Sequence, residues 1–140
     1  MKITGVDHTN WRVKDLEKSL RFYRDVLGLE PFGLEEYRQG ERPIVSLRAT
    51  STFILHLRPD PGFEPGSTGG YDHLALVVDG TDPEALARYL RDSGVEIERR
   101  SEGVVGARGE GTALYVRDPD GYRIELKLYD PSRTEDRCDG

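Results

Sequence analysis

Two stretches of this chain are nearly the same. Each opens with an Asp-His pair in front of a strand-like run, at positions 7–8 and 72–73, and the two pairs are 65 positions apart. Each stretch then continues with an acidic residue, an Arg-containing helical segment and a glycine stop, at Gly28 or Gly94. A tandem duplication explains this pattern, so the two halves are expected to form the same supersecondary module.

The duplication also relates polar residues in the final strand of each half. His56 lies between two leucines in the first half, and 69 positions later Glu125 lies between Ile124 and Leu126. The chain has three histidines, and each one stands at a place that has a polar counterpart in the other copy. The candidates for one shared site are therefore His8, His56, His73 and Glu125.

Hydrophobic periodicity predicts a strand, a helix and three strands in each half. The predicted elements of the first half are a strand at 3–13, a helix at 16–27 after the N-cap Asp15, and strands at 29–37, 43–49 and 52–58. Those of the second half are a strand at 71–78, a helix after the N-cap Asp82, and strands at 95–100, 113–117 and 122–129.

The connections follow from glycine and proline content. Residues 59–70 contain three prolines and four glycines, which is the composition of a linker. Residues 103–111 contain four glycines and are expected to form a mobile loop. The Asp-Pro-Asp-Gly sequence at 118–121 is typical of a type I turn and predicts a hairpin.

Length and charge restrict the classes of protein that this chain can belong to. Its 140 residues suit one compact domain at 1–130, with a flexible tail at 131–140. The formal net charge of −6, without a clear basic cluster, argues against nucleic acid as a partner. The absence of a long apolar run argues against a membrane span, so a cytoplasmic protein is expected. The one cysteine, Cys138, allows no intrachain disulfide.

Strand parity indicates what the four candidate residues could do. Side chains alternate between the faces of a strand, so Glu125 and Lys127 share one face, as do His56 and Arg58. If matching faces of the two modules meet in a cleft, the imidazoles and the carboxylate converge. Histidine nitrogens with one carboxylate suit a divalent Zn, Ni, Co, Mn or Fe ion. Three protein ligands would leave coordination positions open for water and substrate.

These residues and their spacing resemble the vicinal oxygen chelate superfamily, which includes glyoxalase I, fosfomycin-resistance proteins, extradiol dioxygenases and bleomycin-resistance proteins. The most specific pieces are residues 8–15, 19–29, 71–73 and 118–125. The resemblance implies an α+β fold in which two tandem βαβββ modules form a cupped mixed sheet around a metal-binding cleft. The modules would span about residues 3–58 and 71–130, joined by the linker at 59–70, and the protein would be a homodimer.

The resemblance also implies roles for individual residues. The three usual metal ligands of the superfamily match His8, His73 and Glu125. In glyoxalase I a Glu supplies a fourth ligand from the position of His56, so His56 is a candidate ligand or catalytic residue here. Arg12 matches the arginine that binds the glutamyl carboxylate of glutathione, and Asn10 shares its strand face as a second substrate-binding candidate.

The function implied is that of a metal-dependent lyase or isomerase acting on a small substrate with vicinal oxygens. A glutathione hemithioacetal is one such substrate, with glutathione as co-substrate, and Glu125 would move a proton while the metal stabilises an enediolate. Three alternatives remain open at this point. One is an Fe(II)-dependent ring-cleavage dioxygenase, the second is a thiol transferase of the fosfomycin type, and the third is a non-catalytic drug-binding protein of the bleomycin-resistance type.

Overall fold

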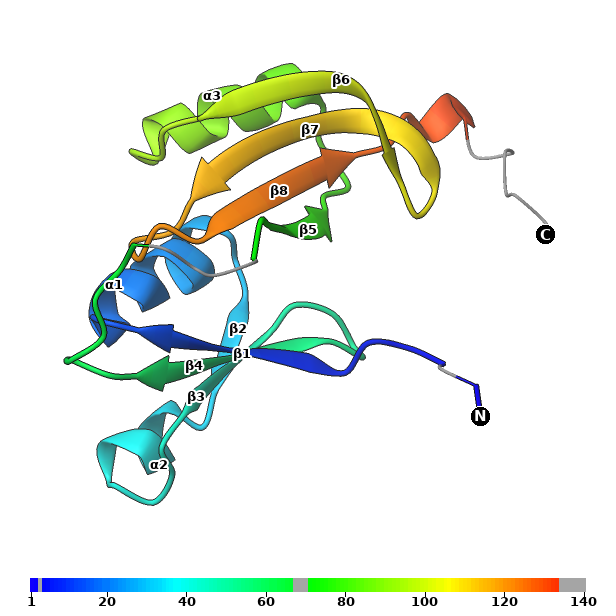
Figure 1. Cartoon of the computed structure of the whole chain (residues 1–140). Helices are drawn as coiled ribbons and strands as arrows, with labels where there is room; N and C mark the ends of the chain where they lie inside the picture. Colours follow the sequence, from blue (N-terminus) through cyan, green and yellow to red (C-terminus); the bar gives the residue numbers. More distant parts are fainter. Residues whose placement is uncertain (3, 67–70, 134–140) are drawn as a thin grey trace. The chain divides into compact units, whose positions relative to one another are not determined.

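The computed structural model describes residues 1–2, 4–66 and 71–133 (Figure 1). The chain forms two compact units, Met1–Gly66 and Ser67–Gly140, each built around its own four-stranded sheet. Part of the predicted linker, at 67–70, and the predicted tail beyond 133, with Cys138, lie outside the described residues. No helix in the described ranges is long and apolar enough to cross a membrane.

The first unit combines four strands with a two-part helix and a short second helix. Its elements are β1 (His8–Val13), α1 (Leu16–Leu20), the π-helix η1 (Arg21–Val26), β2 (Glu30–Phe32), α2 (Leu34–Arg38), β3 (Val45–Arg48) and β4 (Ile54–Pro59). The strand order is β1-β4-β3-β2, with β1 and β4 parallel and the other neighbours antiparallel. The core of this unit includes the fully buried Val13, Leu20, Tyr23, Leu55 and Leu57.

The predicted helix at 16–27 forms in two parts. Asp15 caps it as predicted, because its side chain accepts a hydrogen bond from the Lys18 amide at 3.1 Å. After Leu20 the helix widens to π geometry, closed by a hydrogen bond from the Leu27 amide to the Phe22 carbonyl at 3.0 Å. Gly28 follows with φ of 75°, the left-handed conformation that ends the helix.

The prediction of one strand at 29–37 is wrong. Only Glu30–Phe32 forms a strand, and Gly33 turns the chain with φ of 73°. A positive φ takes the backbone out of the extended conformation, so the strand stops there. The following residues include good helix formers and make α2, on which the Gln39 side chain donates to Glu35 one turn earlier at 3.0 Å.

The second unit repeats the strand order of the first. Its elements are β5 (Leu74–Val77), α3 (Pro83–Asp92), β6 (Arg99–Gly106), β7 (Gly109–Arg117), β8 (Arg123–Leu128) and the 3₁₀-helix η2 (Pro131–Arg133). The order β5-β8-β7-β6, with β5 and β8 parallel, is that of the first sheet with each strand replaced by its counterpart (Figure 1). The duplicated α+β fold is therefore confirmed.

The second helix and the predicted hairpin turn also form as expected. The Asp82 side chain accepts a hydrogen bond from the Ala85 amide at 2.9 Å and so caps α3. In the turn between β7 and β8, the Gly121 amide donates to the Asp118 carbonyl at 3.0 Å. The buried Asp118 carboxylate also accepts from the amides of Asp120 and Tyr122.

The prediction of a mobile loop at 103–111 is wrong, because this segment forms the ends of β6 and β7. Gly103, with φ of 66°, lies where the pairing register shifts between Ser101 and Val104. A Cβ on Gly111 would lie 2.5 Å from the carbonyl oxygen of Leu128. Gly103 therefore permits the irregular pairing of the two strands, and Gly111 permits a close approach of the neighbouring backbone. The strand predicted at 95–100 begins only at Arg99.

Candidate functional site

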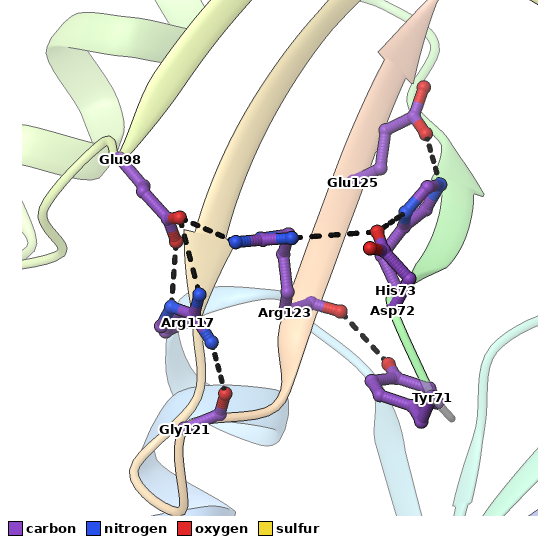
Figure 2. A network of polar contacts seen from close by, with 8 residues as sticks. All are labelled: Tyr71, Asp72, His73, Glu98, Arg117, Gly121, Arg123 and Glu125. Atoms are coloured by element: carbon purple, nitrogen blue, oxygen red, sulfur yellow. Dashed lines mark hydrogen bonds and ion pairs between the residues drawn. The ribbon is translucent and has the colours of Figure 1, made fainter. Parts of the chain in front are cut away.

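The second unit places His73 against Glu125 (Figure 2). His73 lies just before β5, and Glu125 lies on β8 opposite Ala75, two residues after the histidine. The Nε2 atom of His73 is 2.9 Å from Oε2 of Glu125, whose side chain is only 5% exposed. Two of the predicted site residues are therefore in direct contact, with one of them buried.

The other ring nitrogen of His73 is held by the preceding aspartate. Its Nδ1 is 2.6 Å from a carboxylate oxygen of Asp72, and Arg123 approaches the same carboxylate at 3.5 Å. The hydrogen bond with His73, followed by the positive charge of Arg123, lowers the pKa of Asp72. Asp72 is therefore a carboxylate that accepts a hydrogen bond from Nδ1 and fixes the orientation of the ring.

Further polar residues support this arrangement (Figure 2). Arg123 donates to Glu98 at 2.8 Å, and Arg117 donates to the same carboxylate at 2.7 Å. Hydrogen bonds from Arg123 and Arg117 lower the pKa of Glu98. The Tyr71 hydroxyl donates to the Arg123 carbonyl at 2.9 Å, and burial raises the pKa of Tyr71 to about 12. The network connects β7 and β8 to the segment that carries His73.

Lys127 lies on the same strand face as Glu125 and is almost fully buried. Its ammonium group is 3.7 Å from Oε1 of Glu125 and donates to the Val104 carbonyl on β6. It also lies 5.6 Å from the centre of the Tyr129 ring. The buried carboxylate of Glu125 therefore has an imidazole on one oxygen and an ammonium group near the other.

The first unit places His8 beside His56. The two ring centres are 4.8 Å apart, and Nδ1 of His8 is 2.6 Å from a carboxylate oxygen of Asp7. This repeats the contact between Asp72 and His73, so the duplicated Asp-His pair has the same geometry in both units. In each pair the carboxylate contacts Nδ1, so Nε2 is the nitrogen that faces other groups, and in the second unit it contacts Glu125.

His56 is held by a hydroxyl group and not by a carboxylate. Its Nδ1 is 2.8 Å from the hydroxyl of Ser46, which is fully buried on β3, and Arg42 donates to the same hydroxyl at 2.9 Å. Burial is the main cause that lowers the pKa of His56, and electrostatic interactions with His8 and with the Arg42 guanidinium group lower it further. The surroundings of His56 therefore favour the neutral form of its ring.

The four predicted site residues thus fall into two pairs, one in each unit. Within residues 1–2, 4–66 and 71–133, no group of three or more His, Cys, Asp or Glu side chains is arranged to hold a metal ion. The two substrate-binding candidates, Asn10 and Arg12, lie on the exposed side of β1 with His8, while Trp11 and Val13 are buried. Parity along β1 therefore follows the sequence prediction.

Residues 5–126 match the family model described as Glyoxalase/Bleomycin resistance protein/Dioxygenase superfamily. The chain belongs to this family. Among its relatives, the probable lactoylglutathione lyase of Synechocystis is 34% identical over 125 residues, covering 85% of this chain and 91% of that protein. The lactoylglutathione lyase of Salmonella typhimurium is 34% identical over 123 residues, covering 85% and 88%.

A solved structure of the same fold comes from a differently named protein. The crystal structure of virulence protein STM3117 from Salmonella typhimurium superposes with a TM-score of 0.73 at 27% identity. The match covers 93% of this chain and all of that one. The two-module fold of this glyoxalase-family chain is thus shared along nearly its whole length.

The donor chemistry of this glyoxalase-family chain fits a divalent metal. Each unit offers a histidine whose Nδ1 is occupied by an ionisable carboxylate, and the second unit adds the buried Glu125 next to His73. Imidazole nitrogens and one carboxylate are ligands for Zn, Ni, Co and Fe, and a carboxylate on the far ring nitrogen is the usual support of a ligating histidine.

Sequence reasoning missed the residues that hold these side chains. Ser46 stands between Val45 and Leu47 in an apolar strand, and Glu98 stands in a charged stretch, so neither has a distinctive pattern. Strand parity was the one signal available in the sequence. It placed Lys127 on the same strand face as Glu125, but it did not indicate that Lys127 is buried.

Proposed function

We propose that this protein is a divalent-metal-dependent lyase or isomerase of the glyoxalase type, acting on a small substrate with vicinal oxygens. A glutathione hemithioacetal is the first substrate to test, since two relatives that cover most of the chain are named as lactoylglutathione lyases. The observation that carries the proposal is the repeated Asp-His pair, with Nδ1 held at 2.6 Å in both units.

The proposed metal ligands are His8, His73 and Glu125. For the two histidines, the carboxylate on Nδ1 accepts the hydrogen bond of that nitrogen and directs Nε2 toward the metal; at His73 a bound ion would replace the proton that Nε2 shares with Glu125. For Glu125, burial next to His73 supports the assignment, because a buried carboxylate needs a cationic or proton-donating partner. A bound divalent ion would supply a Lewis acid for two adjacent substrate oxygens and stabilise the enediolate.

The protein side chains would perform the remaining tasks. Glu125 is proposed to transfer the proton between the two substrate carbons, as a buried carboxylate with one oxygen near Lys127. Arg12 and Asn10 are proposed to bind the polar end of the substrate. Support for an anionic end comes from Arg58, which is paired with Arg12 in register on β4 and is also exposed.

A homodimer is part of the proposal. Strands β1 and β2 are the edges of the first sheet, and β5 and β6 are the edges of the second. Strand edges that carry unpaired backbone groups are commonly covered by another chain, and closed dimers are the commonest assemblies. The small-molecule substrate and the dimer are both open to direct measurement.

The first experiment is metal analysis of the purified protein, before and after incubation with Ni²⁺, Zn²⁺ or Co²⁺ and removal of excess ion. We expect a single tightly bound ion per chain, lost in His8→Ala and in Glu125→Ala. The control Glu36→Ala removes an exposed acid of α2 and should keep the metal. Circular dichroism establishes that each variant is folded.

The same preparations are then tested with methylglyoxal and glutathione by the ultraviolet absorbance of the thioester product. Activity that requires the metal and is lost in both site variants would support the proposal. A protein that neither contains nor accepts Ni²⁺, Zn²⁺ or Co²⁺ would refute it. Oxygen consumption that requires Fe²⁺, with no thioester formed, would replace the lyase with a dioxygenase.

A further inference from the structure

The hydrogen bonds around His56 point to a role that differs from that of the other two histidines. We infer that His56 presents an Nε2–H donor to a substrate oxygen and is not a metal ligand, and that Ser46 and Arg42 fix this tautomer. The inference rests on the proposed function, because it assigns His56 its task at that site. The tautomer of His56 can be measured without metal, so failure of this inference is distinguishable from failure of the metal proposal.

Arg42 determines how the Ser46 hydroxyl can be used. A guanidinium group has only donors, so at 2.9 Å the Ser46 oxygen must accept this hydrogen bond. The Ser46 hydroxyl then has one proton left to donate. Because Ser46 is fully buried, that proton needs a protein acceptor, or a hydrogen bond is lost in the interior.

His56 is the side chain that can accept a hydrogen bond from the Ser46 hydroxyl. Among the described residues, the other side-chain contact of the Ser46 hydroxyl is Nδ1 of His56 at 2.8 Å. If Nδ1 accepts, it carries no proton, and the proton of the neutral ring is on Nε2. A protonated ring nitrogen has no lone pair for a metal, but it can donate a hydrogen bond to an oxygen.

The duplicated Asp-His pairs differ from His56 in the group that contacts Nδ1. His8 and His73 place Nδ1 against carboxylates, which accept its hydrogen bond, so Nε2 of His8 keeps its lone pair and Nε2 of His73 shares a proton with Glu125 at 2.9 Å. His56 places Nδ1 against a hydroxyl whose own oxygen already accepts from Arg42. A metal ion can therefore bind Nε2 of His8, or replace the proton between His73 and Glu125, whereas Nε2 of His56 carries the proton of its own ring.

The position of Arg42 is built into the fold. A Cβ on Gly33, the residue before α2, would overlap with the guanidinium group of Arg42. Gly33 also has a φ of 73°, which other residues rarely adopt. The chain thus leaves space for the guanidinium group beside the Ser46 hydroxyl. The substrate group that faces His56 is accordingly an acceptor, such as a carbonyl or enolate oxygen, and not a hydroxyl donor.

The deciding experiment reads the tautomer directly, in metal-free protein labelled with ¹⁵N. Long-range ¹H–¹⁵N NMR distinguishes which nitrogen of each imidazole carries the proton. We expect the proton of His56 on Nε2, and a shift toward a mixture of tautomers in Ser46→Ala. Ser51→Ala, which removes an exposed serine of the same unit, should keep the wild-type spectrum of His56. A His56 proton on Nδ1 in the wild-type protein would overturn the inference.

The second measurement is metal affinity by competition with a chelator, for Ni²⁺ and Zn²⁺. We expect His56→Ala to bind within about threefold of wild type, and His8→Ala to lose more than about 100-fold, beyond the loss typical of residues that only support a ligand. Equal losses in the two variants would overturn the assignment of His56. If no variant and no wild-type protein binds metal, the metal proposal fails, while the tautomer spectrum still decides the role of Ser46.

Discussion

The two units have the same strand order, and their last two strands pair in equivalent register, but the surroundings of the equivalent residues differ. His56 on β4 is opposite Ser46, whereas Glu125 on β8 is opposite Tyr115. The first position carries a neutral imidazole above a buried hydroxyl, and the second a carboxylate beside an aromatic ring. The two copies therefore keep the same backbone arrangement, while the side-chain chemistry at the position of His56 and Glu125 differs.

The next position on the same face shows why the surroundings differ. Arg58 on β4 is exposed, whereas its counterpart on β8, Lys127, is buried with its ammonium group 3.7 Å from Glu125. A buried carboxylate requires a nearby positive charge, but a half-buried neutral imidazole such as His56 does not. The neighbour of each site residue thus matches the charge of that residue: the anionic Glu125 has the buried Lys127 beside it, and the neutral His56 leaves Arg58 exposed.

The largest expected effect comes from removing the buried cation. We expect Lys127→Met to lower the free energy of unfolding by about 3 kcal/mol, because it leaves Glu125 without its ammonium neighbour and the Val104 carbonyl without its donor. The equivalent change in the first unit, Arg58→Met, should stay within about 0.5 kcal/mol, since that side chain is exposed. Urea unfolding followed by circular dichroism measures both.

A double variant sharpens this comparison. Adding Glu125→Gln to Lys127→Met removes the uncompensated charge, so the pair should be less destabilised than the sum of the two single changes. Simple additivity, or equal small effects of Lys127→Met and Arg58→Met, would show that Lys127 does not compensate the charge of Glu125.

Sequence reasoning found the features that repeat, and missed those that depend on contacts between strands. The duplication and strand parity identified His8, His56, His73 and Glu125, because these residues occupy related positions along the chain. Ser46 could not be found in this way, since its role depends on the register of β3 against β4.

Two errors in the fold, at 29–37 and at 103–111, have a common origin in glycine. At 103–111 four glycines predicted mobility, but they permit an irregular strand pairing and close packing between strands. At Gly33 a single glycine ended a strand that hydrophobic residues alone would continue. Composition does not show whether a glycine is required for a positive φ, for close packing or for flexibility.

A smaller effect should be equal in the two units. Asp15 and Asp82 cap the first helix of each module through the same contact with a backbone amide, at 3.1 and 2.9 Å. We expect Asp15→Ala and Asp82→Ala each to cost about 1 kcal/mol of unfolding free energy, measured by urea unfolding. Asp79→Ala removes an exposed aspartate that does not begin a helix and serves as the control. A cost confined to one unit would show that the duplicated caps are no longer equivalent.

The smallest effect is specific to the second unit and depends on pH. Hydrogen bonds from Arg123 and Arg117 lower the pKa of Glu98 below its ordinary value of 4.5. The ionised group therefore stabilises the fold above that value, and this contribution is lost as the pH falls through the lowered pKa. Glu98 is partly exposed, so Glu98→Gln should cost less than about 1 kcal/mol at about pH 6.

The test compares urea unfolding at about pH 6 and about pH 3. The wild-type protein should lose more stability between these values than Glu98→Gln, because the variant has no carboxylate to protonate. Glu110→Gln, which removes an exposed acid of β7, should leave the stability at the higher pH unchanged. If Glu98→Gln retained the full wild-type pH dependence, Arg123 would not be held through Glu98, and the support of Asp72 and His73 would have to come from elsewhere in the second unit.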